Sequence, residues 1–283
     1  MIAGNRIGSG IPLDRYAHPT LAPDARQAVF DRNDQKTRDP DLWKLDIDRG
    51  EVSLFERGGG FLPVFLPDGT GIGFTCRMDG KPQFCRKALG GAGPLETLWE
   101  SGDANSLVDF SPDGRFLSYT HVGKRIELWI LPLTGDRRPY RFYPSEFLQF
   151  HGLFSPDGKW IAYTSNETGD FEVYVQPFPA TGEKWKVSVN GGGQATWRHD
   201  GKEMFYRTGD GKMMTVSLKI TPSFATGVPR MLFQSSADPL FPNLGIPYAV
   251  AADGRRFLVN AAIDESRASP ITIITNWTAG LKR

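Results

Sequence analysis

"FSPDGRFLSY" at residues 110–119 and "FSPDGKWIAY" at 154–163 are almost the same ten residues, written twice within one chain of 283. Fainter copies stand at 21–30 ("LAPDARQAVF"), 65–74 ("FLPDGTGIGF"), 197–206 ("WRHDGKEMFY") and 250–259 ("VAADGRRFLV"). A sequence that returns at a nearly fixed period in the forties is typical of a repeat architecture. The aspartate of each copy serves as a marker; the six are Asp24, Asp68, Asp113, Asp157, Asp200 and Asp253.

The fourth copy shows what one repeat folds into. In Ser-Pro-Asp-Gly, proline fixes φ, aspartate caps backbone amides and glycine accepts φ > 0, so the tetrapeptide predicts a tight turn. Segments rich in aromatic and β-branched residues surround it, and they favour strands. The expected strands are 150–154, 160–165, 171–178 and 184–189. Each repeat is therefore predicted to be a four-stranded antiparallel meander.

Six such meanders would bury each other's faces in a ring, which predicts an all-β, six-bladed β-propeller filling residues 1–283 as a single domain. The last repeat is short of a fourth strand, so Ile2 to Ile7 is expected to supply its outer strand and to close the ring. The marker aspartates are expected to cap turns. Four aromatic residues are expected to pack within or between blades and not to form a ligand platform: Trp160, Tyr163, Trp197 and Phe205.

Composition narrows the class of function. With 33 basic and 32 acidic residues the net charge is +1, which offers no basic stripe for nucleic acid. No apolar run approaches the roughly 18 residues of a membrane span, and the start lacks the apolar core of a signal peptide. Cys76 and Cys85 flank the turn "RMDGKP", where a disulfide is geometrically possible; two free, half-buried thiols are the favoured interpretation.

At this point the residues resemble a known group. "FSPDG(R/K)" followed by aliphatic-aromatic strands is similar to the repeats of TolB-like, or WD-repeat-like, propellers. "GGGQATWRHDGKEMFY", "DGRRFLVN" and "PITIITNWTAGLKR" further resemble the C-terminal sensor propellers of bacterial serine/threonine protein kinases. That resemblance implies a sensor outside the cytoplasm and a fused or associated kinase domain. Without the resemblance, the lack of a signal peptide or membrane span in the sequence predicts a cytoplasmic protein. It implies no catalytic residue, because propellers serve many functions.

Catalytic motifs are absent from the sequence: there is no nucleophile elbow, Walker loop or H-E-x-x-H. No catalytic residue, metal ligand set or cofactor is therefore assigned. Two histidines stand out, because His18 and His151 each lie six residues before a marker, at the start of an innermost strand. They are expected either to face an axial opening and bind a ligand, or to be polar residues bonded to neighbouring backbone.

The repeat alignment places the other residues of that axial mouth. Leu62, Leu107, Gln194 and Pro247 occupy the same position in the other repeats. The predicted ligand-binding set is His18, His151, Gln194, Asp109 and Tyr248. The step from Asp200 to Asp253 is longer than the others, and its excess is assigned to an apolar loop at 235–248, which either covers the opening, meets a partner or folds onto its own blade. The partner residues of that loop are Leu240, Phe241, Leu244 and Ile246.

The sequence thus favours a non-catalytic binding module that recognises a protein or a small polar ligand, with no role for nucleic acid and no membrane insertion by this chain. The alternative is a propeller enzyme, a metal-assisted hydrolase, lactonase or lyase with its site at the axial channel. A convergent cluster of three or more His, Asp or Glu side chains would favour the enzyme, whereas an apolar funnel with scattered polar groups would favour binding.

Overall fold

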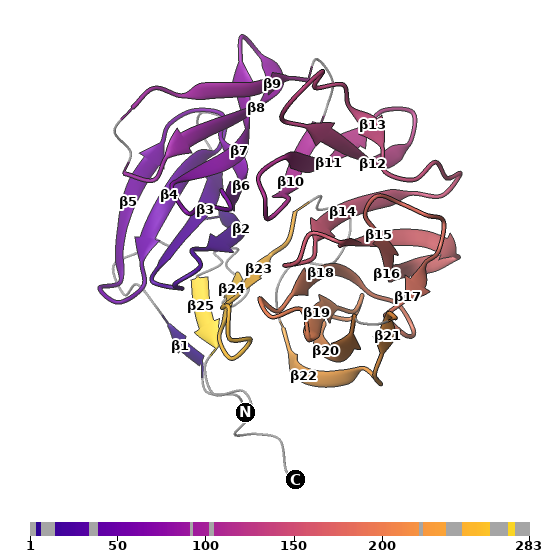
Figure 1. Cartoon of the computed structure of the whole chain (residues 1–283). Coiled ribbons are helices and arrows are strands. Elements are labelled where there is room, and N and C mark those ends of the chain that lie inside the picture. The colour runs from indigo at the N-terminus through magenta and orange to yellow at the C-terminus, as the bar shows by residue number, and fades with distance from the viewer. Residues whose placement is uncertain are drawn as a thin grey trace. The chain divides into compact units, whose positions relative to one another are not determined.

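A computed structural model describes residues 4–6, 15–33, 39–90, 93–101, 105–220, 223–235, 245–260 and 271–274. Every regular element in these residues is a β-strand, so they contain no helix that could cross a membrane. The strands form six antiparallel sheets, five of four strands and one of five (Figure 1). The chain has the all-β propeller arrangement that the repeats predict.

The chain divides into two compact units, and the first combines Met1–Gly102 with Gly245–Arg283. It holds three sheets of four strands each. One sheet consists of β2 (Arg15–Leu21), β3 (Gln27–Asn33), β4 (Asp41–Asp46) and β5 (Glu51–Glu56). The next consists of β6 (Phe61–Phe65), β7 (Gly71–Met78), β8 (Lys81–Ala88) and β9 (Glu96–Glu100). The third consists of β23 (Tyr248–Val250), β24 (Phe257–Asn260), β25 (Ile271–Ile274) and β1 (Gly4–Arg6).

The second unit, Asp103–Gln234, holds the other three sheets. One consists of β10 (Asn105–Phe110), β11 (Phe116–Val122), β12 (Ile126–Pro132) and β13 (Tyr140–Arg141). The next consists of β14 (Gln149–Phe154), β15 (Trp160–Thr168), β16 (Asp170–Pro177) and β17 (Trp185–Lys186). The last consists of β18 (Gly193–Trp197), β19 (Glu203–Arg207), β20 (Lys212–Lys219), β21 (Ala225–Thr226) and β22 (Arg230–Gln234).

The N-terminal strand joins the last sheet, as expected. β1 pairs antiparallel with β25, with Gly4 opposite Ile274 and Arg6 opposite Thr272 (Figure 1). The first and last segments of the chain are therefore hydrogen-bonded in one sheet. The fifth sheet differs from the prediction, because β22 pairs with β20 and adds a fifth strand. β22 ends at Gln234, before the loop predicted at 235–248 begins.

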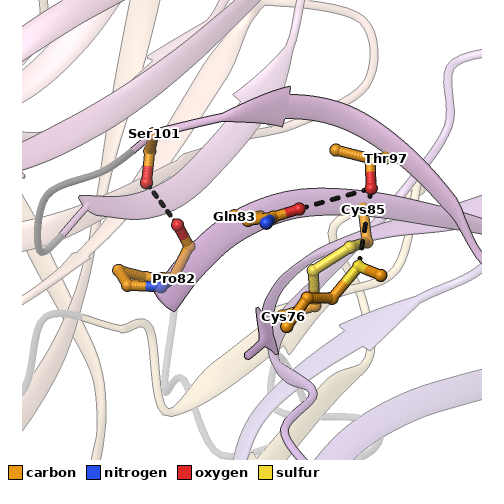
Figure 2. Close-up of a disulfide and its surroundings, with 7 residues drawn as sticks. Cys76, Pro82, Gln83, Cys85, Thr97 and Ser101 are labelled. Carbon is orange, nitrogen blue, oxygen red and sulfur yellow. Dashed lines mark hydrogen bonds between the residues drawn. A yellow bond between two sulfur atoms is a disulfide. The ribbon is translucent and has the colours of Figure 1, made fainter. Parts of the chain in front are cut away.

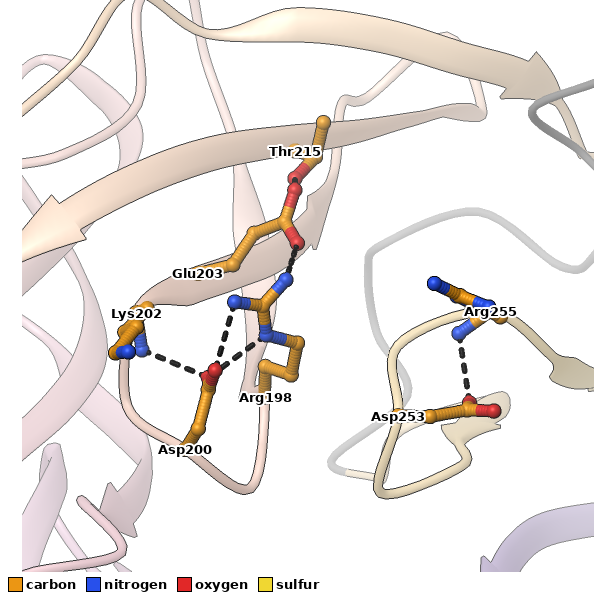
Figure 3. Close-up of polar contacts among 7 residues, drawn as sticks. All are labelled: Arg198, Asp200, Lys202, Glu203, Thr215, Asp253 and Arg255. Carbon is orange, nitrogen blue, oxygen red and sulfur yellow. Dashed lines mark hydrogen bonds and ion pairs between the residues drawn. The ribbon is translucent and has the colours of Figure 1, made fainter.

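The marker aspartates form the turns that the sequence predicts. In all six, Oδ1 accepts a hydrogen bond from the backbone N–H two residues later, at 2.9–3.1 Å. Figure 3 shows two of these turns: Asp200 with Lys202, and separately Asp253 with Arg255. At Asp200 the guanidinium of Arg198 also reaches the carboxylate, at 2.7 and 2.8 Å. These carboxylates are committed to local turns, so their role is structural.

Apolar side chains are buried between neighbouring sheets of each unit. In the second unit, Trp197 and Tyr206 pack with Val173 and Val175 of the preceding sheet. Trp160 is half-buried against the same cluster, while Tyr163 and Phe205 are fully buried. The prediction that these four aromatic residues are packing residues is confirmed. Each sheet thus closes one side of its neighbour's core, as blades do.

The expectation of two free thiols is wrong: Cys76 of β7 and Cys85 of β8 form a disulfide (Figure 2). The hairpin turns at Asp79 and Gly80, both with φ > 0, which is typical of a two-residue Asp-Gly turn. Cys76 therefore lies opposite Gln83, and Cys85 is its diagonal neighbour on the same face. The two Cα atoms are 5.9 Å apart, within the range that a bridge spans.

We expect the double substitution Cys76→Ser with Cys85→Ser to lower the free energy of unfolding by about 2–3 kcal/mol, because the bridge restricts the unfolded chain and both sulfurs are buried. Urea denaturation with and without reductant measures the effect. The double variant, which has no bridge to reduce, is the control for the reductant. Equal midpoints for the oxidised and reduced wild-type protein would show that the bridge does not stabilise the fold.

Candidate functional site

The inner strands share an unusual backbone feature at the residue six positions before the marker. Each of the five inner strands before β23 has a register shift at this point of its pairing with the next strand. In four of them the residue has a positive φ of 46–55°, although none is glycine: His18, Leu62, His151 and Gln194. Non-glycine residues in this region carry strain that the surrounding structure must offset. The repeat alignment of the predicted site is thus reproduced in the backbone.

A second shared position lies seven residues after each marker, and we call it the interblade position. A polar side chain occupies it in every repeat, in the middle of an apolar strand, and all six are less than 9% exposed: Asp31, Thr75, Thr120, Thr164, Arg207 and Asn260. The sequence analysis missed this column. Its signal was a polar residue directly after the aromatic or aliphatic pairs of the second strand.

Several interblade side chains link their sheet to the next one within a unit. The hydroxyls of Thr120 and Thr164 accept hydrogen bonds from the backbone N–H groups of His151 and Gln194, at 3.4 and 3.2 Å. In the first unit, Oδ1 of Asp31 accepts from the N–H of Leu62 at 3.3 Å. The strained residue of one inner strand is therefore held by the sheet before it. This bond stabilises the left-handed conformation that the inner strands need.

The first unit brings His18 together with a buried carboxylate. Nδ1 of His18 lies 2.8 Å from Oδ1 of Asp31, whose side chain is only 2% exposed, whereas the imidazole is 20% exposed. The same carboxylate bonds to Leu62, so His18 and Leu62 are neighbours through Asp31. Tyr248 is fully buried in β23 of this unit. His18 is thus bonded to a side chain and not to backbone, and its ring is oriented.

In the second unit, the predicted site residues are more deeply buried than residues at the rim of an opening would be. His151 and Gln194 are each 1% exposed. The guanidinium of Arg207 donates to Oε1 of Gln194 at 3.2 Å, which pairs an inner-strand residue with the interblade residue of its own sheet. The His151 ring meets Phe150 edge-on at 4.8 Å. The two histidines belong to different units, and each is described only within its own.

Asp109 is the titratable residue of this region whose pKa differs most from its ordinary value. Burial raises the pKa of its carboxyl to about 7, although the backbone N–H groups of Phe154 and Phe110 act in the opposite direction. Phe154 donates to Oδ2 at 2.9 Å. The residue keeps a partly exposed edge, but the surrounding protein limits its hydration. A carboxyl group with a pKa near neutrality can donate or accept a proton at physiological pH.

Asp109 should make stability depend on pH. An unfolded aspartate titrates near pH 4, so between about pH 4 and pH 7 the folded protein holds a proton that the unfolded chain does not. The contribution of this group is therefore fully present at low pH and is lost as the pH rises through 7. We expect Asp109→Asn to be more stable than wild type at about pH 8 and no more stable at about pH 5. Urea denaturation at both values tests this, with Asp48→Asn, an exposed carboxylate, as control.

A further hollow of about 660 Å³ lies along the sheet of β2–β5. The guanidinium of Arg32 stands over the Trp43 ring at 5.1 Å. Nε1 of Trp43 and Oε1 of Gln27 are buried there without a hydrogen bond to the described residues. The hollow is a second candidate ligand site, polar and aromatic in character. Its walls are Tyr16, Gln27, Arg32, Trp43, Lys44, Asp46, Gly50, Glu51, Val52 and Ser53.

The described residues contain no group of three or more His, Cys, Asp or Glu side chains placed to hold a metal ion. Of the apolar loop, Leu240, Phe241 and Leu244 fall outside the described residues, and Ile246 is half-buried. The inner strands therefore carry the imidazole of His18 in the first unit, and the imidazole of His151, the amide of Gln194 and the carboxyl of Asp109 in the second. Such groups can orient a polar ligand by hydrogen bonds.

No protein-family model matches the sequence, and no curated protein matches it either. Solved structures do. TolB from Acinetobacter baumannii is 18% identical with a TM-score of 0.68; the match covers 93% of this chain and 61% of that one. The chain thus spans about three fifths of that TolB.

Two further structures illustrate the range of relatives. A protein assigned as TolB in Agrobacterium tumefaciens is 14% identical, with a TM-score of 0.64 over 78% of this chain and 82% of its own. An oligogalacturonate lyase solved in complex with manganese is 11% identical, with a TM-score of 0.61 over 97% of this chain and 96% of its own. At these identities the likeness establishes a TolB-like propeller fold and leaves activity open.

Proposed function

We propose that this chain is a non-catalytic binding propeller, which recognises a protein or a small polar ligand through its inner-strand residues. The observation that carries the proposal is the row of strained, hydrogen-bonded positions on the inner strands, occupied by His18, His151 and Gln194. Asp109 and Tyr248 are proposed as further ligand-binding residues, each within its own unit. Strain of this kind collects at functional sites, where the surrounding fold offsets it. The TolB-like neighbours support a binding role.

The proposal includes a single ring of six blades, closed by the N-terminal strand. Six repeats in the sequence and the pairing of β1 with β25 support it. Deleting residues 1–6 would unpair one edge of β25, and we expect it to lower the free energy of unfolding by about 1–3 kcal/mol. Thermal melting of the truncated protein tests this. A melting temperature within a degree or two of the full chain would place the closure elsewhere.

We further propose that the chain works outside the cytoplasm, in association with a kinase domain or another signalling partner. The resemblance to kinase-linked sensor propellers suggests both. The Cys76–Cys85 disulfide supports the location, because disulfides persist in oxidising compartments and are rare in the cytosol. Thiol labelling of the protein in intact cells, with and without prior reduction, tests the location. Free thiols in the native host would contradict it.

A thermal-shift screen tests binding at the inner strands. Sugar acids, amino acids and short peptides are the probes, and a compound that raises the melting temperature of wild type is carried forward. We expect its effect to disappear in the double substitution His18→Asn with His151→Asn, which keeps a polar group at each position, and to persist in the control His199→Ala, an exposed histidine. A shift that survives the double substitution but is lost in Trp43→Ala would move the site to the hollow of β2–β5.

The oligogalacturonate lyase neighbour favours a second candidate function, a metal-assisted lyase or hydrolase. Oligogalacturonate is incubated with the protein with and without added Mn²⁺, and the unsaturated product of elimination is followed by ultraviolet absorbance. Turnover that requires the metal and is lost in Asp109→Asn would replace the binding proposal by the enzyme. No turnover under either condition, together with a ligand found in the screen, would favour binding.

A further inference from the structure

Gly245 makes an unusually close approach to the predicted ligand residue His18. A Cβ atom built on Gly245 would lie 1.8 Å from Cδ2 and 2.3 Å from Nε2 of the His18 ring, and 2.6 Å from Cδ2 of Leu62. These distances are far shorter than any non-bonded contact between carbon atoms. All three residues belong to the first unit. The main chain at residue 245 therefore lies directly on the imidazole, and only a residue without a side chain fits there.

The imidazole has little freedom to make room. Its Nδ1 is bonded to Asp31 at 2.8 Å, and this carboxylate is itself buried and also bonded to Leu62. The backbone of His18 is held at φ 46° within β2. The ring is thus fixed on its Nδ1 side, while its Nε2 edge points at Gly245. Nε2 is the atom through which an imidazole oriented in this way would contact a ligand.

The chain after Gly245 is anchored in the core of the same unit. Pro247 and Tyr248 are buried, and Tyr248 begins β23. Backbone N–H of Asn260 donates to the carbonyl of Pro247 at 3.0 Å. The sheet therefore anchors the residues that follow Gly245 and brings Gly245 next to His18. Contact with His18 follows from where β23 begins.

We propose that the main chain at Gly245 occupies the place of the ligand on His18, so that a ligand must displace it. This rests on the proposed binding function and specifies its regulation. Because the site accepts main chain that carries no side chain, flanked by the apolar Leu62, the displacing ligand is a peptide with glycine at the contacting residue. When no ligand is present, the main chain at Gly245 therefore occupies the site.

Chemical modification of His18 tests the self-occupied site without any ligand. Diethylpyrocarbonate reacts with accessible imidazole nitrogen, and mass spectrometry reports each histidine separately. We expect Gly245→Ala to raise the modification rate of His18 by about tenfold, because the added Cβ forces the segment off the ring. Gly209→Ala is the matched control, since a Cβ there meets nothing within 4 Å. Equal His18 rates in Gly245→Ala and wild type would overturn the proposal.

If Gly245→Ala does not unfold cooperatively, the wild-type protein alone tests whether Gly245 shields Nε2 of His18. His18 is 20% exposed and His199 is exposed, so accessibility alone predicts a modest difference in their rates. Shielding of Nε2 by Gly245 predicts that His18 reacts about tenfold more slowly than His199. Rates within about twofold of each other would overturn the proposal.

Peptides added in trans test the class of ligand. The hexapeptide NLGIPY reproduces residues 243–248, and NLAIPY differs by one methyl group. At about 1 mM, a concentration that detects weak binding, NLGIPY is expected to restore slow modification of His18 in Gly245→Ala, whereas NLAIPY is not. Protection by both peptides or by neither would overturn the glycine-peptide ligand. These readouts are independent of the small-molecule screen, so failure of the binding proposal and failure of self-occupation are distinguishable.

Discussion

Trp197→Ala is expected to lower the free energy of unfolding by about 3–5 kcal/mol, the largest effect of any single substitution considered for this chain. The indole is 8% exposed and packs in the cluster between the sheets of β14–β17 and β18–β22. Its Nε1 also donates to the carbonyl of Leu153 at 3.1 Å, so alanine removes both a large apolar surface and a bond between two sheets. Urea denaturation measures the loss.

Trp160→Ala is the matched control for that measurement. Its indole packs at the edge of the same cluster, against Trp185 at 5.5 Å and Phe224 at 5.2 Å, but it remains half-buried. We expect roughly half the cost of Trp197→Ala, since less apolar area returns to water. If Trp197→Ala proves mild while ligand binding is lost, the indole is a ligand platform and not a packing residue.

Asp31→Ala is expected to cost about 2–4 kcal/mol, because it removes a buried acceptor that two donors share. The carboxylate accepts from Nδ1 of His18 and from the N–H of Leu62, and it is 1% exposed. Without it, Leu62 loses the bond that holds its left-handed backbone, and the His18 ring loses the bond that orients it. Denaturation midpoints report the cost, and an increased rate of His18 modification reports the freed ring.

Thr164→Val separates the charge of Asp31 from the shared role of the interblade position. The hydroxyl of Thr164 accepts the N–H of Gln194 at 3.2 Å and has no charge, so a cost of about 1 kcal/mol is expected. Equal costs for Asp31→Ala and Thr164→Val would mean that the pairing with His18 contributes nothing. In that case the His18–Asp31 contact is incidental to stability.

Much of the fold could be predicted from the sequence, because turn chemistry and strand periodicity act locally. The marker aspartates cap their turns, and the N-terminal segment joins the last sheet, as the repeat indicates. The bridge between Cys76 and Cys85 was not predicted, since only the positive φ of Asp79 and Gly80 fixes which residues of the hairpin face each other. The fifth strand of its sheet, β22, was not predicted, because nothing local shows that it returns to pair with β20.

The candidate site was less predictable, because its chemistry depends on contacts between repeats. The positions of His18, His151 and Gln194 followed from alignment, but their burial and their left-handed backbone did not. The contact of Gly245 with His18 joins residues more than two hundred positions apart, and no local pattern encodes it. The interblade column was visible in the sequence, yet its meaning required the hydrogen bonds to the next inner strand.

The interblade position also bears on how this chain could have arisen and how it could change. Asp31, Thr120 and Thr164 each accept from the N–H of the following inner strand. The fifth repeat carries Arg207 at this position, a donor and not an acceptor. Asn260 in the last repeat donates instead to the carbonyl of Tyr16 in the first. Gene duplication would have produced identical modules. Substitutions at the interblade position have since matched the side chains of these modules to the hydrogen-bonding groups of their neighbours. Exchanging or inserting a repeat would place a side-chain donor such as Arg207 against a backbone N–H, which is also a donor. The order of the repeats is therefore constrained by the hydrogen bonds between them.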